Sequence, residues 1–290
     1  MTSIKVAFNK KFILNLFLKF ILYVSLSLWT LLEIYPMFFM LFNGLKTKAQ
    51  ILTSRWSVPW PPQFSNWLTV LVGDSTHSYG LDRYFLNSSI VLIGTLILTV
   101  LISSMAGHAL AYYKFTGIKF FQRIVVASVI IPVQVALIPI FVLMGNLHLR
   151  NNFLGVILLY TAFSLPFSIL IMRSSFEGIP REIIEAAKLD GCSEFEIFWW
   201  ITFPMVKPGI SAVSAINSVG IWGELLFAFV LMNQPAMRLL NPGVMAFSGS
   251  ANLNIQYLLA ALTIASLPLL ILFIIFQRQI MKGMSMGSFR

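Results

Sequence analysis

Residues 84–113 read YFLNSSIVLIGTLILTVLISSMAGHALAYY and contain no Asp, Glu, Lys or Arg. A helix needs ~20 mostly apolar residues to cross a bilayer, so this one stretch is long enough to do so. Residues 124–149 and 151–172 are uncharged as well. Together the three stretches predict a protein that crosses a membrane several times.

The composition of the whole chain agrees with this prediction. Of its 290 residues, 58% are hydrophobic and 10% are charged, against roughly 25% charged residues in soluble domains. Such a chain cannot cover its surface with polar groups, so lipid must be its main solvent. The net charge of +10 does not indicate a nucleic-acid partner, because the basic residues are scattered between apolar stretches and do not gather on one face.

The sequence predicts an all-α, polytopic membrane protein with six transmembrane helices. The apolar region after Lys19 is expected to be a retained first span, because it is too long for a signal peptide and no cleavage site follows it. Glu33 and Pro36 interrupt the first span, and Glu224 lies near the end of the fifth. The six predicted spans cover residues 12–44, 87–112, 124–145, 153–172, 209–232 and 256–277.

The positions of Lys and Arg set the expected orientation, since these residues are enriched in cytoplasmic segments. With the N-terminus inside, 14 of the 20 Lys and Arg residues lie in inner segments and the other six in outer loops. Both termini are therefore expected in the cytoplasm. Residues 45–86 then form the longest outer loop, and residues 173–208 form a long inner loop that holds six of the ten acidic residues.

Within the inner loop, residues 178–208 (GIPREIIEAAKLDGCSEFEIFWWITFPMVKP) predict two short helices joined by a tight elbow. Pro180 favours a helix start. Gly191 can take the positive φ that often ends a helix. Ser193 and Glu196 have the spacing of a capping box, which begins the second helix. The elbow is therefore expected at Gly191.

The second helix is expected to end at Pro204 and Pro208. Leu189 and Ala187 are expected on an apolar side of the helix pair. Ala186 and Ala187, with the elbow glycine, keep one surface low, so that another protein can approach the backbone closely. Taken alone, this pattern fits a docking lever or an amphipathic linker that lies on the membrane.

The same loop contains an ordered set of small, acidic and helix-ending residues, namely Glu185, Ala186, Ala187, Gly191, Ile201 and Pro204. This set resembles the EAA motif of ABC importer permeases. In that family the motif forms a coupling helix that sits in a cleft of a cytoplasmic ATPase. Asp190, and Arg181 with Glu182 after Pro180, are similar to the carbohydrate-uptake branch of the family, which includes the maltose-type permeases.

The resemblance covers most of the chain from about residue 30. Asn87-Ser88 is similar to the start of the family's second span, residues 132–134 with Pro139 to its third, and Leu267-Pro268 to part of its sixth. The segment from Phe276 resembles the family's C-terminal end. The resemblance implies a type I ABC importer permease fold, with an N-terminal segment (1–85), a five-helix transmembrane domain (86–277) that contains the coupling loop 178–208, and a cytoplasmic tail (278–290).

The resemblance also implies partners. These are a second permease subunit in a heterodimer, two ATPase subunits, an extracytoplasmic solute-binding protein and the lipid bilayer of a prokaryotic inner or plasma membrane. ATP and Mg would bind to the partner ATPase, and no cofactor is expected in this chain. The residues expected to couple the chain to the ATPase are Arg181, Glu182, Glu185, Ala186, Ala187, Asp190, Gly191 and Pro204.

The sequence departs from the family at Trp222-Gly223-Glu224, where members often carry Trp-Asn-Glu or Trp-Asn-Asp. The missing asparagine amide removes a hydrogen-bonding group from the translocation region, and this leaves the substrate class open. Polar residues within the spans can line a substrate path, but hydrogen bonds between helices explain them equally well. The candidate substrate-path residues are Gln134, Asn217, Trp222, Glu224 and Gln256.

Motifs for chemistry within the chain are absent. A phosphate-binding loop of the form G-x-x-x-x-G-K-[ST] does not occur, and neither does H-E-x-x-H. The single cysteine, Cys192, excludes a disulfide framework and a cysteine-based metal site. No catalytic residue and no metal ligand is therefore expected, and ATP hydrolysis is expected on a separate chain.

The sequence thus favours the permease subunit of an ATP-driven importer for a sugar or oligosaccharide. An importer of the same architecture for a glycerophosphodiester or a polyamine is an open alternative. A stand-alone secondary transporter or channel predicts inverted repeats with broken helices, and the sequence shows neither by inspection. An intramembrane enzyme is a more distant alternative.

Overall fold

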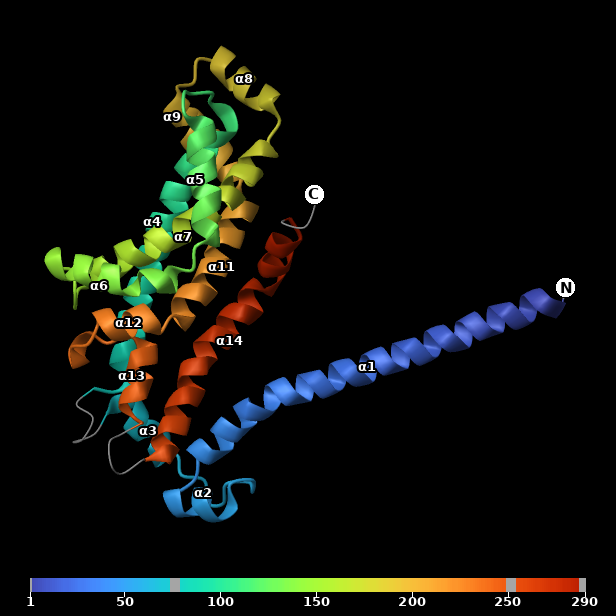
Figure 1. The fold of residues 1–290 in the computed structure, drawn as a ribbon, viewed down its shortest axis with the longest axis vertical. Helices are drawn as coiled ribbons and strands as arrows, with labels where there is room; N and C mark the ends of the chain where they lie inside the picture. Colours follow the sequence, from blue (N-terminus) through green and yellow to red (C-terminus); the bar gives the residue numbers. More distant parts are fainter. Residues whose placement is uncertain (1, 74–78, 249–253, 287–290) are drawn as a thin grey trace.

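The computed structural model describes residues 2–73, 79–248 and 254–286, and over these residues it is helical with no strand (Figure 1). This confirms the all-α class. The longer helices are α1 (Thr2–Gly44), α4 (Leu81–Tyr112), α5 (Ile118–Ile130), α7 (Phe153–Glu177), α11 (Lys207–Gly223) and α14 (Ile255–Met286). The shorter elements are α2 (Lys48–Ser54), α3 (Ser65–Val72), η1 (Val133–Ala136), α6 (Leu137–Asn146), α8 (Arg181–Leu189), α9 (Glu194–Glu196), η2 (Ile197–Thr202), α10 (Phe203–Met205), α12 (Leu226–Leu231), η3 (Pro235–Met237) and α13 (Leu240–Ala246).

Among the residues that the structure describes, four helices are long and apolar enough to cross a membrane, and they match the first, second, fourth and sixth predicted spans. They are Phe12–Gly44, Leu81–Tyr112, Phe153–Glu177 and Ile255–Gln277. A fifth span is possible if the pair Ile118–Ile130 and Val133–Asn146, bent by 90°, counts as one. The third and fifth predicted spans are therefore not single straight helices.

The break in the third predicted span has a local cause at Pro132. Proline has no N–H to donate within a helix, and it drives the residue before it away from helical angles. Ile131 accordingly has φ −77° and ψ 120° and ends α5, after which η1 and α6 turn away. The prolyl residue was visible in the sequence, but the 90° change of direction was not.

The fifth predicted span breaks at Glu224. Helix α11 ends at Gly223, Glu224 has the extended angles φ −69° and ψ 127°, and α12 begins at Leu226. Two predicted spans thus contain broken helices, although the sequence showed none by inspection. Broken helices alone therefore do not separate a stand-alone transporter from an ATP-driven permease.

The centre of the bundle is the long contact between α4 and α7. Small and hydroxyl-bearing residues allow transmembrane helices to approach closely, and Thr95, Thr99 and Ser103 on α4 are fully buried. At Gly107 the backbones approach closely, since a Cβ added there would lie 2.8 Å from the backbone nitrogen of Arg173. The pair α4–α7 therefore runs as one unit through the molecule.

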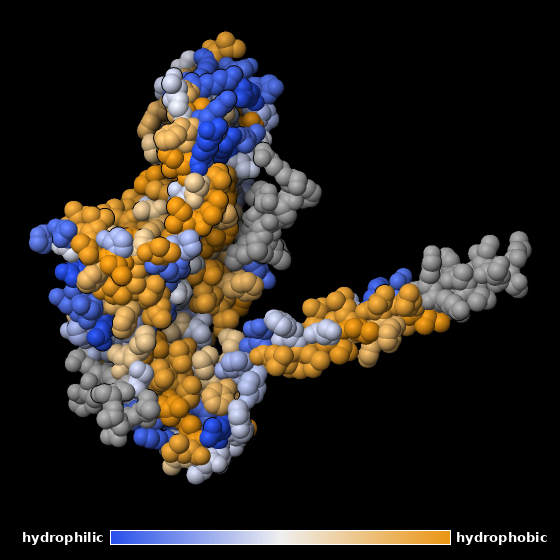
Figure 2. All heavy atoms as spheres, viewed as in Figure 1, coloured by the Kyte–Doolittle hydropathy of each residue, from blue (hydrophilic) through white to orange (hydrophobic). Residues whose placement is uncertain are grey.

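Helix α1 meets the rest of the bundle near its C-terminal end, where a Cβ added to Gly44 would lie 2.9 Å from backbone atoms of Ala260 on α14. From there α1 departs from the bundle, and its side chains between Phe12 and Tyr35 are exposed (Figure 1). Figure 2 shows that this helix is largely apolar.

The loops at the two ends of the bundle are well separated. Helices α8 and α9 lie at one end, and α2 and α3 lie at the opposite end (Figure 1). In Figure 2 hydrophilic residues gather over the α8–α9 end, and apolar residues form a belt along the bundle below it. The inner loop 173–208 and the outer loop 45–86 are therefore on opposite sides of the apolar region.

Candidate functional site

The elbow in the inner loop has the predicted geometry. Gly191 has φ +85°, and its N–H donates a hydrogen bond to the carbonyl of Lys188 at 3.1 Å. The N–H of Cys192 donates to the carbonyl of Ala187 at 3.0 Å. These bonds satisfy carbonyls that the end of α8 would otherwise leave free. The prediction of a helix break at Gly191 is confirmed.

The capping box that starts the second helix is also confirmed. The backbone N–H of Glu196 donates to Ser193 Oγ at 3.3 Å, and the backbone N–H of Ser193 donates to Glu196 Oε2 at 2.8 Å. This second bond, together with a hydrogen bond from the Ser193 hydroxyl, lowers the pKa of the Glu196 carboxyl. The charged carboxylate therefore holds the start of α9 at neutral pH.

The expected end of the second helix needs a correction. Pro204 lies within α10 and does not end the helical run, and Pro208 lies in the first turn of α11. The irregular residue is Val206, with φ −89° and ψ 19°. A proline is tolerated in the first turn of a helix, where its missing N–H has no partner to lose. The wider π-helical turn η2, which comes directly before α10, differs from the α-helical pattern that the sequence suggested.

The inward face of α8 is formed by Ile184 and Ala187, which are 7% and 5% exposed and pack with the buried Ile197. Leu189 is 89% exposed. Because a helix turns by about 100° per residue, Leu189 points away from Ala187, two positions earlier. The prediction of Leu189 on the apolar side is therefore wrong, and Ala187 is not part of the open surface.

Six of the eight predicted coupling residues are exposed in α8 and the elbow, and four of them (Glu182, Ala186, Asp190 and Gly191) lie on the outward face of the helix pair, away from the rest of the described chain. The other two, Arg181 and Glu185, border the cavity between α8 and α4. A Cβ added to Gly191 would meet nothing within 4 Å. Pro204 is exposed further along the loop. The exposed residues of α8 and the elbow are Arg181, Glu182, Glu185, Ala186, Lys188, Leu189, Asp190 and Gly191.

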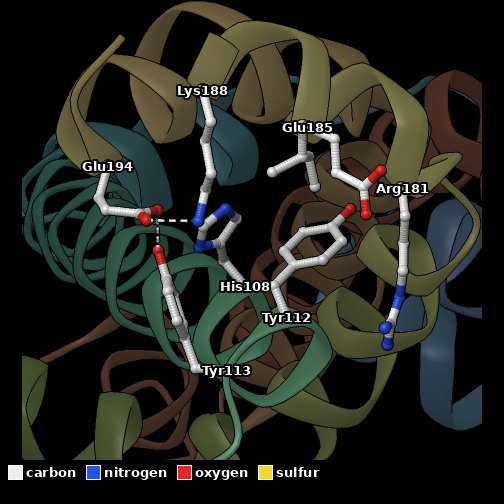
Figure 3. A pocket seen from close by; sticks show the side chains of 8 residues that line it. His108, Tyr112, Tyr113, Arg181, Glu185, Lys188 and Glu194 are labelled. Atoms are coloured by element: carbon white, nitrogen blue, oxygen red, sulfur yellow. Dashed lines mark hydrogen bonds and ion pairs between the residues drawn. The ribbon is translucent and has the colours of Figure 1, made fainter. Parts of the chain in front are cut away.

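Behind this face, a cavity of ≈ 160 Å³ separates α8 from the end of α4 (Figure 3). Tyr113, directly after α4, points into it and donates its hydroxyl hydrogen bond to the carboxylate of Glu194. The other oxygen of Glu194 accepts from Lys188 Nζ at 2.6 Å. Figure 3 shows this chain of contacts from α4 through α9 to α8.

The protonation states of Glu194 and Tyr113 favour these contacts at neutral pH. The hydrogen bond from Lys188, then that from Tyr113, lowers the pKa of the Glu194 carboxyl. Burial first, and then the hydrogen bond to Glu194 and its charge, raise the pKa of Tyr113 to about 12. Tyr113 is therefore a protonated donor and Glu194 a charged acceptor.

His108, one helical turn before Tyr112 on α4, lies among aromatic rings at the same place. It is 5% exposed, and its ring centroid lies 5.2 Å from those of Phe176 and Phe198. Among the described residues, no hydrogen-bond partner is present for His108 Nε2. A role for His108 or Tyr113 was not predictable from the sequence, because their partners in the inner loop are far away along the chain.

Four of the five candidate substrate-path residues lie on η1, α11 and α14, and the fifth, Glu224, lies between α11 and α12. Asn217 Nδ2 on α11 donates to Ser168 Oγ at 2.9 Å. Trp222 is 7% exposed, with its ring 5.4 Å from that of Phe85. Glu224 follows α11 and accepts hydrogen bonds from the backbone N–H groups of Phe227 and Ala228 at 2.9 and 3.0 Å.

The two glutamines lie apart from these residues in the sequence and on other elements. Gln134 is exposed in η1, at the bend of the third predicted span, and the Gln256 Oε1 atom is buried in the first turn of α14. Asn217 and Glu224 thus have hydrogen-bond partners within the chain. Contact of any of the five with a substrate stays a prediction.

Comparison with known proteins identifies the family. Residues 99–286 match the model of the binding-protein-dependent transport system inner membrane component family. The chain is 33% identical over 267 residues to the diacetylchitobiose uptake system permease protein of Streptomyces coelicolor, covering 91% of this chain and 87% of the relative. It is 29% identical to the arabinooligosaccharides transport system permease protein of Bacillus subtilis, covering 89% and 91%.

A solved structure has the same fold. It belongs to a bacterial ABC transporter involved in the import of the acidic polysaccharide alginate, and it matches with a TM-score of 0.76 at 20% identity over 88% of this chain and 93% of that one. The resemblance to ABC importer permeases is confirmed. The chain belongs to the family of binding-protein-dependent transport system inner membrane components.

Proposed function

We propose that the chain is one of two permease subunits of an ATP-driven, binding-protein-dependent importer for a sugar or oligosaccharide. The observation that carries this proposal is the exposed face of α8, which is held in a fixed position by the Gly191 elbow and the Ser193 cap at the polar end of the bundle. Such a rigid, open surface suits docking of a separate ATPase.

The proposed cargo class rests on the relatives. The two permeases described above are named for diacetylchitobiose and for arabinooligosaccharides. The solved transporter of the same fold is named for alginate, a polysaccharide. The three cargoes share hydroxyl-rich sugar rings, so we propose the same chemical class for this chain.

The proposed topology has six spans, with α11 and α12 together as the fifth and both termini in the cytoplasm. The 14 to 6 distribution of the 20 Lys and Arg residues supports this orientation. It places α8–α10 on the side where ATP is present, and α2 and α3 on the side of the solute-binding protein. The domain division at residues 85 and 277 follows the same topology.

The proposed coupling uses the exposed face of α8. Glu185 makes a charged contact with a basic residue of the ATPase, while Ala186 and Gly191 allow a close approach of the two backbones. Arg181 and Glu182 steady the start of the helix. ATP binding on the ATPase pair, with Mg there, moves the helix pair and switches the permeases between inward-facing and outward-facing states.

The test is co-purification of the complex from membranes. Glu185→Lys reverses the charge of an exposed residue at the edge of the proposed docking face, and we expect it to reduce the amount of ATPase that co-purifies with the chain. Asp82→Lys is the matched control, because Asp82 is an exposed acidic residue on α4 at the opposite end. Full retention of the ATPase by Glu185→Lys would remove Glu185 from the contact, and absence of any ATPase with the unchanged chain would refute the proposed function.

A further inference from the structure

Along the chain, the segment α8–α10 is directly preceded by α7 and directly followed by α11, whereas α4 is not adjacent to it. Helix α4 is nevertheless the element that packs most intimately along α7 through the buried Thr95, Thr99 and Ser103 and the close contact at Gly107. A movement of the elbow reaches α4 directly only through side chains. Two sets of side chains at the end of α4 make this connection.

The first set consists mainly of aromatic ring contacts. His108 and Tyr112 on α4 form edge-on ring contacts with each other at 4.9 Å, and His108 also contacts Phe198 of η2 at 5.2 Å. The Tyr112 hydroxyl donates to the carbonyl of Phe176 on α7 at 2.5 Å. The ring contacts with Phe198 have no hydrogen bond to hold them in one position, and the hydrogen bond of Tyr112 goes to α7 and not to the elbow.

The second set is polar and directional. Lys188 lies in the last turn of α8 and Glu194 at the start of α9, so their contact at 2.6 Å closes the Gly191 elbow from both sides. The Tyr113 hydroxyl, fixed at the end of α4, binds the same carboxylate. One carboxylate therefore joins three elements, two of which (α8 and α9) the chain connects through the short segment 190–193.

We propose that Tyr113, Glu194 and Lys188 form a linkage that makes the elbow and α4 move as one body when the ATPase acts. This inference rests on the proposed function and adds the route by which the movement enters the membrane. Tyr113 and Glu194 are positioning residues, because they act through α8 and not by contact with a substrate.

The small contribution of an exposed ion pair to folding separates a role in transmitting movement from a role in stabilising the fold. The side chains of Lys188 and Glu194 are 48% and 53% exposed, and exposed ion pairs contribute only about 0–1 kcal/mol to folding. Loss of the linkage should therefore leave the protein folded and the ATPase bound. Its effect should appear as relative movement between the elbow and α4.

The experiment uses the full importer complex in lipid nanodiscs, with Cys192 replaced by alanine and spin labels at Leu189 on α8 and Met105 on α4, both of which are exposed. The distance distribution between the labels is measured before and after MgATP with vanadate. In the otherwise unchanged complex we expect no shift. In Tyr113→Phe and Glu194→Gln we expect the distribution to shift and broaden when MgATP and vanadate are added.

Lys188→Arg, which keeps the charge, should behave as the unchanged complex, and Lys188→Met should behave as Tyr113→Phe. Lys114→Met is the matched control, since Lys114 is an exposed neighbour of Tyr113. Identical distributions in Tyr113→Phe and the unchanged complex would overturn the linkage. Co-purification of the ATPase is checked first in every sample, so failure of the proposed function is seen separately as a missing ATPase.

Discussion

The hydroxyl of Tyr160 on α7 donates a hydrogen bond to the carboxylate of Glu224, the residue at which the fifth predicted span breaks. The same carboxylate accepts the backbone N–H groups of Phe227 and Ala228 at 2.9 and 3.0 Å. Glu224 thus supplies acceptors to the open start of α12 and ties that start to α7. A broken helix inside an apolar bundle needs such partners, because lipid offers none.

We expect Glu224→Ala to lower the stability of the folded chain by about 1–3 kcal/mol, the cost of leaving buried donors without an acceptor. Tyr160, which is 3% exposed, and two N–H groups would lose their partner. Glu224→Gln keeps one acceptor oxygen and should lose less. Thermal unfolding in detergent measures both, and an Ala variant as stable as the unchanged protein would show that the carboxylate does not support the break.

Three glycines should respond differently to alanine. A Cβ at Gly107 would lie 2.8 Å from the backbone of Arg173, whereas a Cβ at Gly94 would meet the mobile end of the Ile157 side chain at 2.8 Å. We expect Gly107→Ala to cost about 1–3 kcal/mol through overpacking, and Gly94→Ala to cost less. Gly220→Ala is the control, since nothing lies within 4 Å of the new Cβ.

The same thermal unfolding experiment compares the three glycine variants. Equal stability of Gly107→Ala and Gly220→Ala would contradict a backbone-to-backbone contact between α4 and α7. A larger loss in Gly94→Ala than in Gly107→Ala would do the same.

The raised pKa of Tyr113 predicts that the stability of the folded chain depends on pH in the alkaline range. Its pKa is raised from 10.0 to about 12 in the folded chain, so between these values the folded state holds a proton that the unfolded state has released. Stability must then fall as the pH rises through this range. Tyr113→Phe removes this contribution, so its unfolding temperature should fall less steeply between pH 10 and 12. Parallel curves for the two proteins would contradict the assignment.

The buried Lys46 is expected to hold α2 in place in the outer loop. Its side chain is 1% exposed, and Nζ donates to the carbonyls of Ser54 and Arg55 at 3.0 and 3.2 Å. These carbonyls lie at the C-terminal end of α2, where a cation is favourable. We expect Lys46→Met to speed amide hydrogen exchange in α2, and Lys48→Met, at an exposed position, to leave it unchanged. Unaltered exchange in Lys46→Met would show that α2 is held by other contacts.

Local rules predicted the helical class and the elbow well. Gly191 and the Ser193–Glu196 cap are short-range features, and the structure reproduces both. Hydropathy alone located four of the six predicted spans as helices. The direction of the third span after Pro132 was not predictable in this way, because it depends on packing and not on composition.

The composition of the site was harder to predict than its position. Leu189 was assigned to the wrong face because an apolar residue at a helix end can point to either side, and only the packed structure decides. Tyr113 meets Glu194 although 81 residues separate them. No spacing rule predicts a contact between residues so far apart in one sequence, so only the structure revealed the contact between α4 and the elbow.

The central claim is that the outward face of α8 docks on an ATPase, and site-directed crosslinking tests it most directly. A cysteine at Ala186, in a chain with Cys192 replaced by alanine, receives a short thiol-reactive photocrosslinker in the assembled complex. A second sample carries the cysteine at Leu52, which is 67% exposed on α2 at the opposite end. We predict a crosslink to the ATPase from residue 186 and none from residue 52. The absence of an ATPase crosslink at 186, in a complex that contains the ATPase, would contradict the account.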